Sequence, residues 1–184
     1  MPEFNLGKHL EEARRNNLFT DVTIVVAERK EFKAHKVVLA AQSDFFKTRF
    51  ATRWGKGSSD ERVEMTDVPS FVMEAILLYM YTGKVVDIEK VALHILSAAE
   101  EYGLVGLRKM CEQALAKTLT IENAVDVLVH ANANNAQDLK KVCMDYIATS
   151  VASVRKSDGW RKLKGNQDHH DLWVEILETI AENN

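Results

Sequence analysis

The residues that most often do chemistry in proteins occur here in few useful patterns. The chain has six histidines and two cysteines, and Cys111 lies too far from Cys143 for the paired spacing of a zinc finger. The one local cluster of metal-ligating side chains is Asp168-His169-His170-Asp171. Neighbouring side chains of a helix point roughly 100° apart and rarely meet at one ion. We therefore expect a solvated helix start there, and no bound metal.

Sequence motifs of catalysis are also missing. GxSxG, HExxH and GxGxxG do not occur in the 184 residues. The stretch Gly55-Lys56-Gly57-Ser58-Ser59 is rich in glycine but lacks the GxxxxGK[ST] spacing that cradles phosphates. We predict a flexible surface loop at this stretch, and a protein that is not an enzyme and uses no cofactor.

Charge and apolar content exclude further classes of partner. The formal net charge is −3, so no strong field favours nucleic acid or an acidic membrane. The modest basic run Arg155-Lys156, Arg161-Lys162 and Lys164 is expected to be a solvated face. No apolar run reaches the ~18 residues of a membrane span. Two cysteines are too few for a secreted disulfide framework, so we expect reduced thiols in an intracellular protein, nuclear or cytoplasmic.

The first half of the sequence mixes strand and helix patterns. The expected order is a helix over 4–16, strands over 19–26 and 31–34 joined by a turn at 27–30, helices beginning at 35 and at Ser43, a loop over 55–61, a strand over 62–65, and a helix over 70–81 that ends at Gly83.

The second half reads entirely as helix, with expected segments over 88–101, 104–116, 121–132, 135–149 and 168–182 and breaks at Gly103 and Gly159. The fold class is therefore α+β, with helices around a small sheet, followed by an all-α extension. We place the domain boundary near 117–120, which gives domains 4–118 and 119–184.

Two apolar features need a partner surface. The helix over 4–16 carries an apolar face that includes Leu6 and Leu10. A run of large aromatics follows at Phe45, Phe46, Phe50 and Trp54. We expect Phe46 and Phe50 in the core and Trp54, beside the polar loop, as an exposed anchor.

Several motifs resemble the BTB/POZ family over residues 18–110. They are Phe19-Thr20-Asp21-Val22, the run from Glu31 to Ser43, Phe45-Phe46, Tyr79-Met80-Tyr81-Thr82-Gly83 and Ala98-Ala99-Glu100-Glu101-Tyr102. The C-terminal part is similar to the speckle-type POZ protein (MATH-BTB) branch, through Met110-Cys111-Glu112, 119–124 and Ser157-Asp158-Gly159-Trp160. Residues 119–184 then correspond to a shortened BACK-like helical region.

This resemblance implies a homodimer. The positions that match the dimer interface of BTB domains are Leu6, Leu10, Leu18 and Phe19. Asp21 and Lys36 match the acidic and basic residues of a charged pocket near that interface, although an ordinary ion pair at a strand-to-helix junction would have the same residues.

The resemblance also implies a cullin-3 adaptor, with a substrate-binding MATH domain outside these residues. The matching cullin-3 surface comprises Phe45, Phe46, Trp54, Lys56, Tyr102 and Leu104. In relatives a glutamate stands where this chain has Lys56. Two functions therefore remain open: an adaptor that brings substrates to a cullin-3 RING ubiquitin ligase, and a dimeric scaffold, for example in transcriptional regulation, that does not bind cullin-3.

Overall fold

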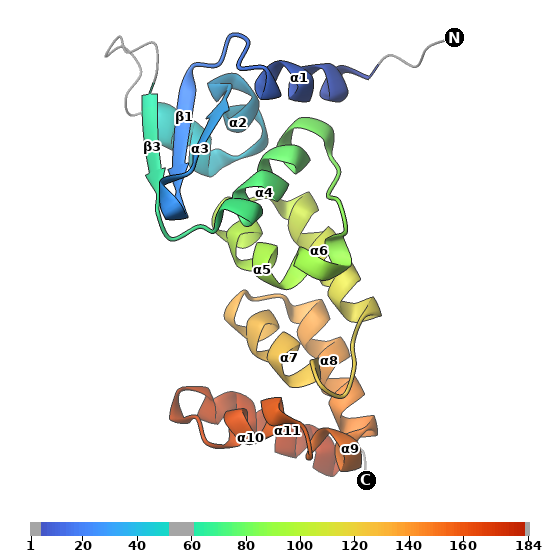
Figure 1. Ribbon diagram of the computed structural model, residues 1–184. Helices are drawn as coiled ribbons and strands as arrows, with labels where there is room; N and C mark the ends of the chain where they lie inside the picture. The colour runs from blue at the N-terminus through green and yellow to red at the C-terminus, as the bar shows by residue number, and fades with distance from the viewer. Residues whose placement is uncertain (1–4, 52–60, 183–184) are drawn as a thin grey trace. The chain divides into compact units, whose positions relative to one another are not determined.

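The computed structural model describes residues 5–51 and 61–182, which fold into two compact units. The first unit comprises Met1–Asp87 and Ala98–Leu107, and the second comprises Ile88–Ser97 and Arg108–Asn184. The first contains strands and helices, whereas the described part of the second is helical (Figure 1). This arrangement confirms the predicted α+β class with an all-α extension.

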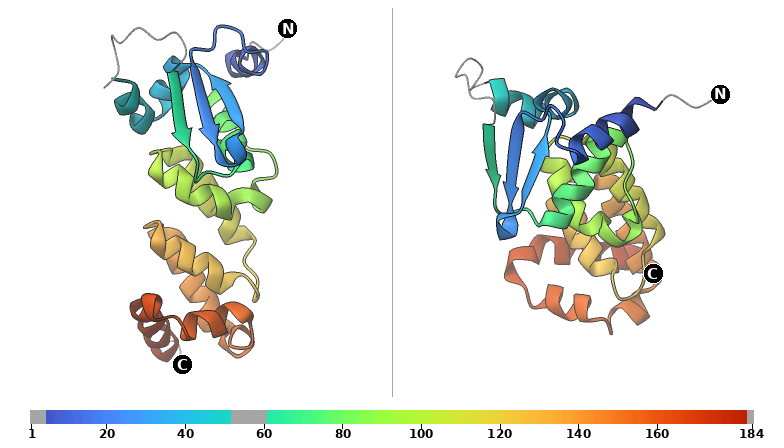
Figure 2. Two further views of the ribbon diagram at one scale, coloured as in Figure 1. Left: turned by 60° about the vertical axis from the view of Figure 1, so that its left-hand side comes forward. Right: turned by 45° about the horizontal axis from the view of Figure 1, so that its top comes forward.

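The first unit contains a three-stranded sheet (Figures 1 and 2). β1 (Val22–Val26) lies between β2 (Glu31–Ala34), to which it is antiparallel, and β3 (Glu61–Met65), to which it is parallel. Every residue of β1 is buried. Its β-branched sequence suits a central strand that is covered on both faces.

The chain bends sharply on both sides of β1. The 3₁₀ turn Ala27–Arg29 joins β1 to β2, as the sequence predicted, with Glu28 in the left-handed region at φ 56°. The predicted start of the first strand at Phe19 is wrong, because Phe19 has a φ of 57° and cannot continue a strand. The strand begins only at Val22.

Four helices pack around the sheet: α1 (Leu6–Arg15), α2 (Lys36–Gln42), α3 (Asp44–Ala51) and α4 (Ser70–Thr82). Ser43 separates α2 from α3, where its hydroxyl donates to the Tyr102 carbonyl at 2.6 Å and accepts from the Phe46 amide at 3.3 Å. The apolar helix α4 supplies much of the core and ends at Gly83, whose φ of 70° is the predicted left-handed stop.

Helix α1 packs against α4 through a close approach of the two backbones. A Cβ atom on Gly7 would lie 2.6 Å from the carbonyl oxygen of Tyr81. Only glycine therefore allows α1 to reach this position on α4.

Two helices follow, α5 (Ile88–Glu101) and α6 (Val105–Lys117), and Gly103 turns the chain between them with a φ of 66°. The second unit continues with α7 (Ala124–Ala133), α8 (Gln137–Thr149), α9 (Val151–Val154), α10 (Asp158–Lys164), a 3₁₀ turn (Gln167–His169) and α11 (His170–Glu182).

The predicted break at Gly159 is wrong, because this residue lies inside α10. Ser157 begins that helix by accepting a hydrogen bond from the Trp160 amide at 3.2 Å. A Cβ atom on Gly159 would lie 3.1 Å from Cβ of Val125 on α7, so glycine permits tight packing of the two helices. The short helices α9 and α10 were not predicted from the sequence.

Along the described residues, none of the helices is both long and apolar enough to cross a membrane.

Candidate functional site

Three large apolar side chains near the start of the chain are exposed: Leu6 at the beginning of α1, and Leu18 and Phe19 in the segment that follows α1. Their exposed fractions are 57%, 51% and 95%. We call these three residues the N-terminal apolar surface. Leu10, the fourth apolar residue predicted at the dimer interface, is half-buried on α1. A contiguous patch of large exposed apolar side chains marks an interaction site.

Phe19 is the most unusual residue of this surface. Its backbone is left-handed, which costs a bulky side chain of order 1–3 kcal/mol. The strained backbone presents an almost fully exposed aromatic ring, which gains nothing from burial within its own unit. A strained and exposed aromatic residue is the pattern expected of a binding anchor.

A hydrogen-bonded chain holds the segment that carries Leu18 and Phe19. The amide of His35 donates to the Tyr81 hydroxyl at 2.9 Å, and His35 Nδ1 lies 2.7 Å from the same oxygen. His35 Nε2 lies 2.8 Å from the carbonyl oxygen of Leu18. When the Tyr81 hydroxyl donates to Nδ1 of His35, the Nε2–H group of His35 donates to the Leu18 carbonyl oxygen. This hydrogen bond fixes the backbone just before Phe19. Burial raises the pKa of Tyr81 to about 12, so its hydroxyl keeps the proton.

Helix α1 also carries a buried ion pair, which contacts Tyr81 at the end of α4. Glu11 and Arg14 are each 6% exposed, and two hydrogen bonds of 2.7 Å join the guanidinium to the carboxylate. Arg14 also lies over the Tyr81 ring, 5.6 Å from its centroid. Burial raises the pKa of Glu11, but hydrogen bonds from Arg14 and Arg15 outweigh it and hold that pKa below its ordinary value. The sequence suggested no role for this pair.

Asp21 and Lys36 lie together, but the contact runs through the backbone. Asp21 Oδ1 accepts a hydrogen bond of 2.7 Å from the Lys36 amide and so caps the start of α2. The Lys36 ammonium instead lies 3.3 Å from Glu61 Oε2 on β3. Sequence reasoning missed Glu61, whose position follows only from the parallel pairing of Val22 with Glu61.

Three of the residues predicted to contact cullin-3, Phe45, Phe46 and Tyr102, form one aromatic cluster in the first unit. The Phe45 ring centroid lies 5.2 Å from Phe46 and 5.0 Å from Tyr102. Phe46, Tyr102 and Leu104 are 0%, 1% and 3% exposed, whereas Phe45 is half-buried. In this arrangement Phe45 offers contact area, and Phe46 and Tyr102 support its ring. Trp54 and Lys56 lie outside the described residues.

Phe46 and Phe50 are core residues, as predicted, with exposed fractions of 0% and 3%. Their rings are stacked, with centroids 5.9 Å apart. Both residues belong to α3, and their burial turns this face of the helix toward the core.

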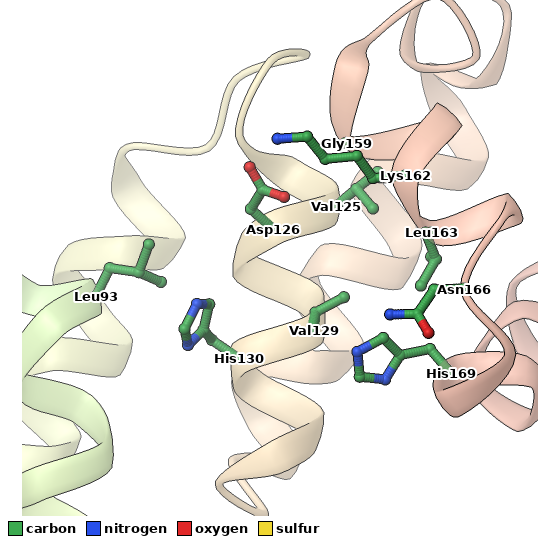
Figure 3. Close-up of a pocket in the computed structure, with 10 residues that line it drawn as sticks. All are labelled: Leu93, Val125, Asp126, Val129, His130, Gly159, Lys162, Leu163, Asn166 and His169. Atoms are coloured by element: carbon green, nitrogen blue, oxygen red, sulfur yellow. The ribbon is translucent and has the colours of Figure 1, made fainter.

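A pocket of about 270 Å³ in the second unit gathers several polar side chains (Figure 3). Asp126 and His130 come from α7, Lys162 from α10, and His169 from the following turn. The two imidazoles lie on opposite sides of Val129 rather than meeting at one point (Figure 3). Within residues 5–51 and 61–182, no group of three or more ligating side chains could hold a metal ion.

The two cysteines are buried and unpaired. Burial raises the pKa of each thiol to about 12, and the charge of Glu112 adds to the effect on Cys111. Because only the thiolate reacts, we expect the native protein at pH 8 to resist a thiol reagent such as dithionitrobenzoate, whereas the urea-unfolded protein should label at both cysteines. Rapid labelling of the native protein at either cysteine would contradict this burial.

Two comparisons place the chain among known proteins. A family model for the BTB/POZ domain matches residues 10–119. TD and POZ domain-containing protein 3 of Mus musculus is 34% identical over 182 residues, which cover 98% of this chain and 49% of the relative. The chain thus spans about half the length of this curated relative. BTB/POZ domains are in general protein-interaction modules without catalytic activity. By the match to the family model, the chain belongs to the BTB/POZ domain family.

Proposed function

We propose that this chain is a non-catalytic homodimerising adaptor that links protein substrates to a cullin-3 RING ubiquitin ligase. The observation that carries the proposal is the N-terminal apolar surface, with Leu6, Leu18 and the strained Phe19 exposed on the BTB/POZ unit. Such an adaptor accelerates ubiquitin transfer by holding the substrate near the ligase. A dimer doubles the docking sites and raises their effective concentration.

The proposed dimer buries the N-terminal apolar surface of one copy against that of a second copy, with Leu10 at its edge. A two-fold interface uses the same patch on both subunits, so a self-complementary apolar patch suits it. Asp21 and Lys36 contribute to the interface indirectly. The hydrogen bond from the Lys36 amide to the Asp21 carboxylate fixes the start of α2 relative to β1. The Lys36 and Glu61 pair supplies the charged rim in place of an Asp21–Lys36 ion pair.

A photo-crosslinking experiment tests this dimer. We expect benzoylphenylalanine incorporated at Phe19 to give a covalent dimer on irradiation, with crosslinked peptides from the first unit. The same amino acid at Val86, which is 70% exposed in the same unit, serves as the matched control. Crosslinking only at the control position would place self-association elsewhere.

The proposed cullin-3 surface centres on Phe45 and includes Trp54 and Lys56. The Phe45 ring is half-buried and rests on Tyr102, so it is pre-oriented for contact at little cost in side-chain entropy. In this proposal Phe46, Tyr102 and Leu104 are buried residues that support the ring without contacting cullin-3.

The wider assignment follows the speckle-type POZ protein branch. We propose residues 119–184 as a BACK-like region and residues 4–118 as the BTB domain, with the substrate-binding domain outside this chain. The mouse relative is named for a TD domain as well as a POZ domain, and half of its length lies outside the match. An intracellular location, nuclear or cytoplasmic, accompanies this function.

The second candidate function is a dimeric scaffold without cullin-3 binding. Lys56 favours it, because the resemblance to the family implies a glutamate at this position. A lysine there reverses the charge that would meet the partner, and like-charge contacts at a rim slow association.

The substitution Lys56→Glu separates the two functions. We expect it to raise the association rate with the N-terminal domain of cullin-3 about tenfold at low salt, with a smaller change in dissociation rate, because it restores rim complementarity. Stopped-flow measurements at two salt concentrations check this expectation, with Lys117→Glu as a charge-matched control. An unchanged association rate would exclude a cullin-3 contact at Lys56.

A further inference from the structure

A basic groove lined with aromatic side chains lies in the second unit, apart from the surfaces described above. It has a volume of about 400 Å³ and lies among α10, α11 and the residue that follows α9. The residues that line it are Arg155, Trp160, Arg161, Lys164, Trp173 and Leu177. We call it the Trp160–Trp173 groove.

The charge of this groove is opposite to that of the chain. Its lining contains two arginines, one lysine and no carboxylate, whereas the whole chain has a net charge of −3. Arg161 pairs with Asp158 at the rim, which neutralises part of its charge. Arg155 and Lys164 are both exposed, and no carboxylate pairs with either of them within the described residues. They leave two cations facing solvent at the groove.

The groove also has an aromatic and apolar part, formed by Trp160, Trp173 and Leu177. The rings of Trp160 and Trp173 pack edge to face with centroids 4.8 Å apart, and Arg155 lies over the Trp160 ring at 5.9 Å. Leu177 is 39% exposed on the same lining. A short apolar side chain of a bound peptide could contact Trp173 and Leu177, while neighbouring carboxylates of the same peptide reach the cationic groups of the groove. Guanidinium groups bind carboxylates with paired hydrogen bonds, which adds geometric selectivity.

We propose that the Trp160–Trp173 groove is a docking site for an acidic peptide segment of a partner protein, in which carboxylates flank an aliphatic side chain. Charge complementarity between the cationic lining and the peptide carries this assignment. The groove shares no residue with the proposed dimer and cullin-3 surfaces, so the proposal stands without them.

Single-stranded nucleic acid would also favour cations beside aromatic rings, but the ring geometry disfavours it. Bases bind by stacking on open aromatic faces. Trp160 is only 6% exposed, Trp173 packs against it edge to face, and Arg155 covers one of its faces. A peptide side chain needs only the apolar edges that remain.

The test is fluorescence anisotropy of the complete chain with a labelled acidic peptide, Glu-Glu-Leu-Leu-Glu-Glu, at low and at physiological salt. We expect saturable binding that weakens as salt rises. Replacing glutamate by glutamine, or leucine by glycine, in the peptide should weaken binding at least about tenfold, since each removes one of the two kinds of contact.

Charge reversal locates the site. The double variant Arg155→Glu and Lys164→Glu should weaken binding of the acidic peptide at least about tenfold. Lys109→Glu with Lys141→Glu makes the same change in net charge at exposed lysines outside the groove and should leave affinity within about twofold.

The proposal would be overturned by the absence of saturable binding, by equal weakening in both double variants, or by tighter binding of oligothymidine than of the acidic peptide. Circular dichroism of both double variants separates lost binding from lost folding. A folded groove variant that still binds the peptide with unchanged affinity would also overturn it.

Discussion

Replacing Phe19 with aspartate is expected to turn the proposed dimer into a monomer in sedimentation velocity. The reason is the position of Phe19, which is 95% exposed within its own unit and central to the proposed interface. Loss of an aromatic anchor costs about 2 kcal/mol or more, and a charge left in an apolar interface adds to this. We expect the dimer dissociation constant to rise at least about 30-fold.

The same substitution should leave the fold of the monomer intact. Aspartate tolerates the left-handed backbone better than phenylalanine, so the φ of 57° becomes less strained. Val86→Asp is the matched control, because Val86 is an exposed apolar residue outside the proposed interface. If both substitutions weakened the dimer equally, or if neither weakened it, the assigned interface would be wrong.

Replacing Glu11 with alanine is expected to destabilise the first unit by about 3 kcal/mol, because it leaves the buried Arg14 charge without its carboxylate. Hydrogen exchange of the β1 amides, measured by mass spectrometry, reports the unfolding free energy of this unit alone. Glu12→Ala changes the neighbouring exposed carboxylate and should cost less than about 0.5 kcal/mol. Equal effects of the two substitutions would show that the ion pair adds nothing.

The contribution of Glu11 should depend on pH in a defined direction. The pKa of Glu11 is lowered in the folded protein, so the ionised form stabilises folding. The stability difference between the native protein and Glu11→Gln should be constant above the ordinary pKa of 4.5. It should shrink as pH falls below that value through the folded pKa. A difference that grows on acidification would reverse the assigned sign.

Much of the fold was predictable because local patterns and packing agree. The helix over Ile88–Glu101 and the strand over Glu31–Ala34 have the predicted bounds, since their apolar periodicity matches the buried face. Gly83 ends α4 as expected, because its left-handed backbone lets its amide donate to the Tyr79 carbonyl and close the last turn. A prediction was wrong where a residue was judged by its type alone. Gly159 was expected to break a helix, but it lies within α10, where glycine allows close packing against α7.

The contacts that define the candidate sites were less predictable because they join residues distant in sequence. Nothing local indicates that the Lys36 ammonium meets Glu61 while Asp21 takes the Lys36 amide. The exposure of Phe19 depends on a backbone angle that strand propensity argues against. The basic run near the C-terminus reads as a solvated face, yet α10 and α11 place part of it beside two tryptophans.

The most direct test of the central proposal is titration calorimetry of this chain against the N-terminal domain of cullin-3, with light scattering on the same samples. A self-associating adaptor predicts a dimer that binds one cullin-3 domain per protomer, with saturation at micromolar concentration or below. A monomer, or a dimer with no heat of binding at tens of micromolar, would contradict the adaptor function, and the dimer result would leave the scaffold as the function.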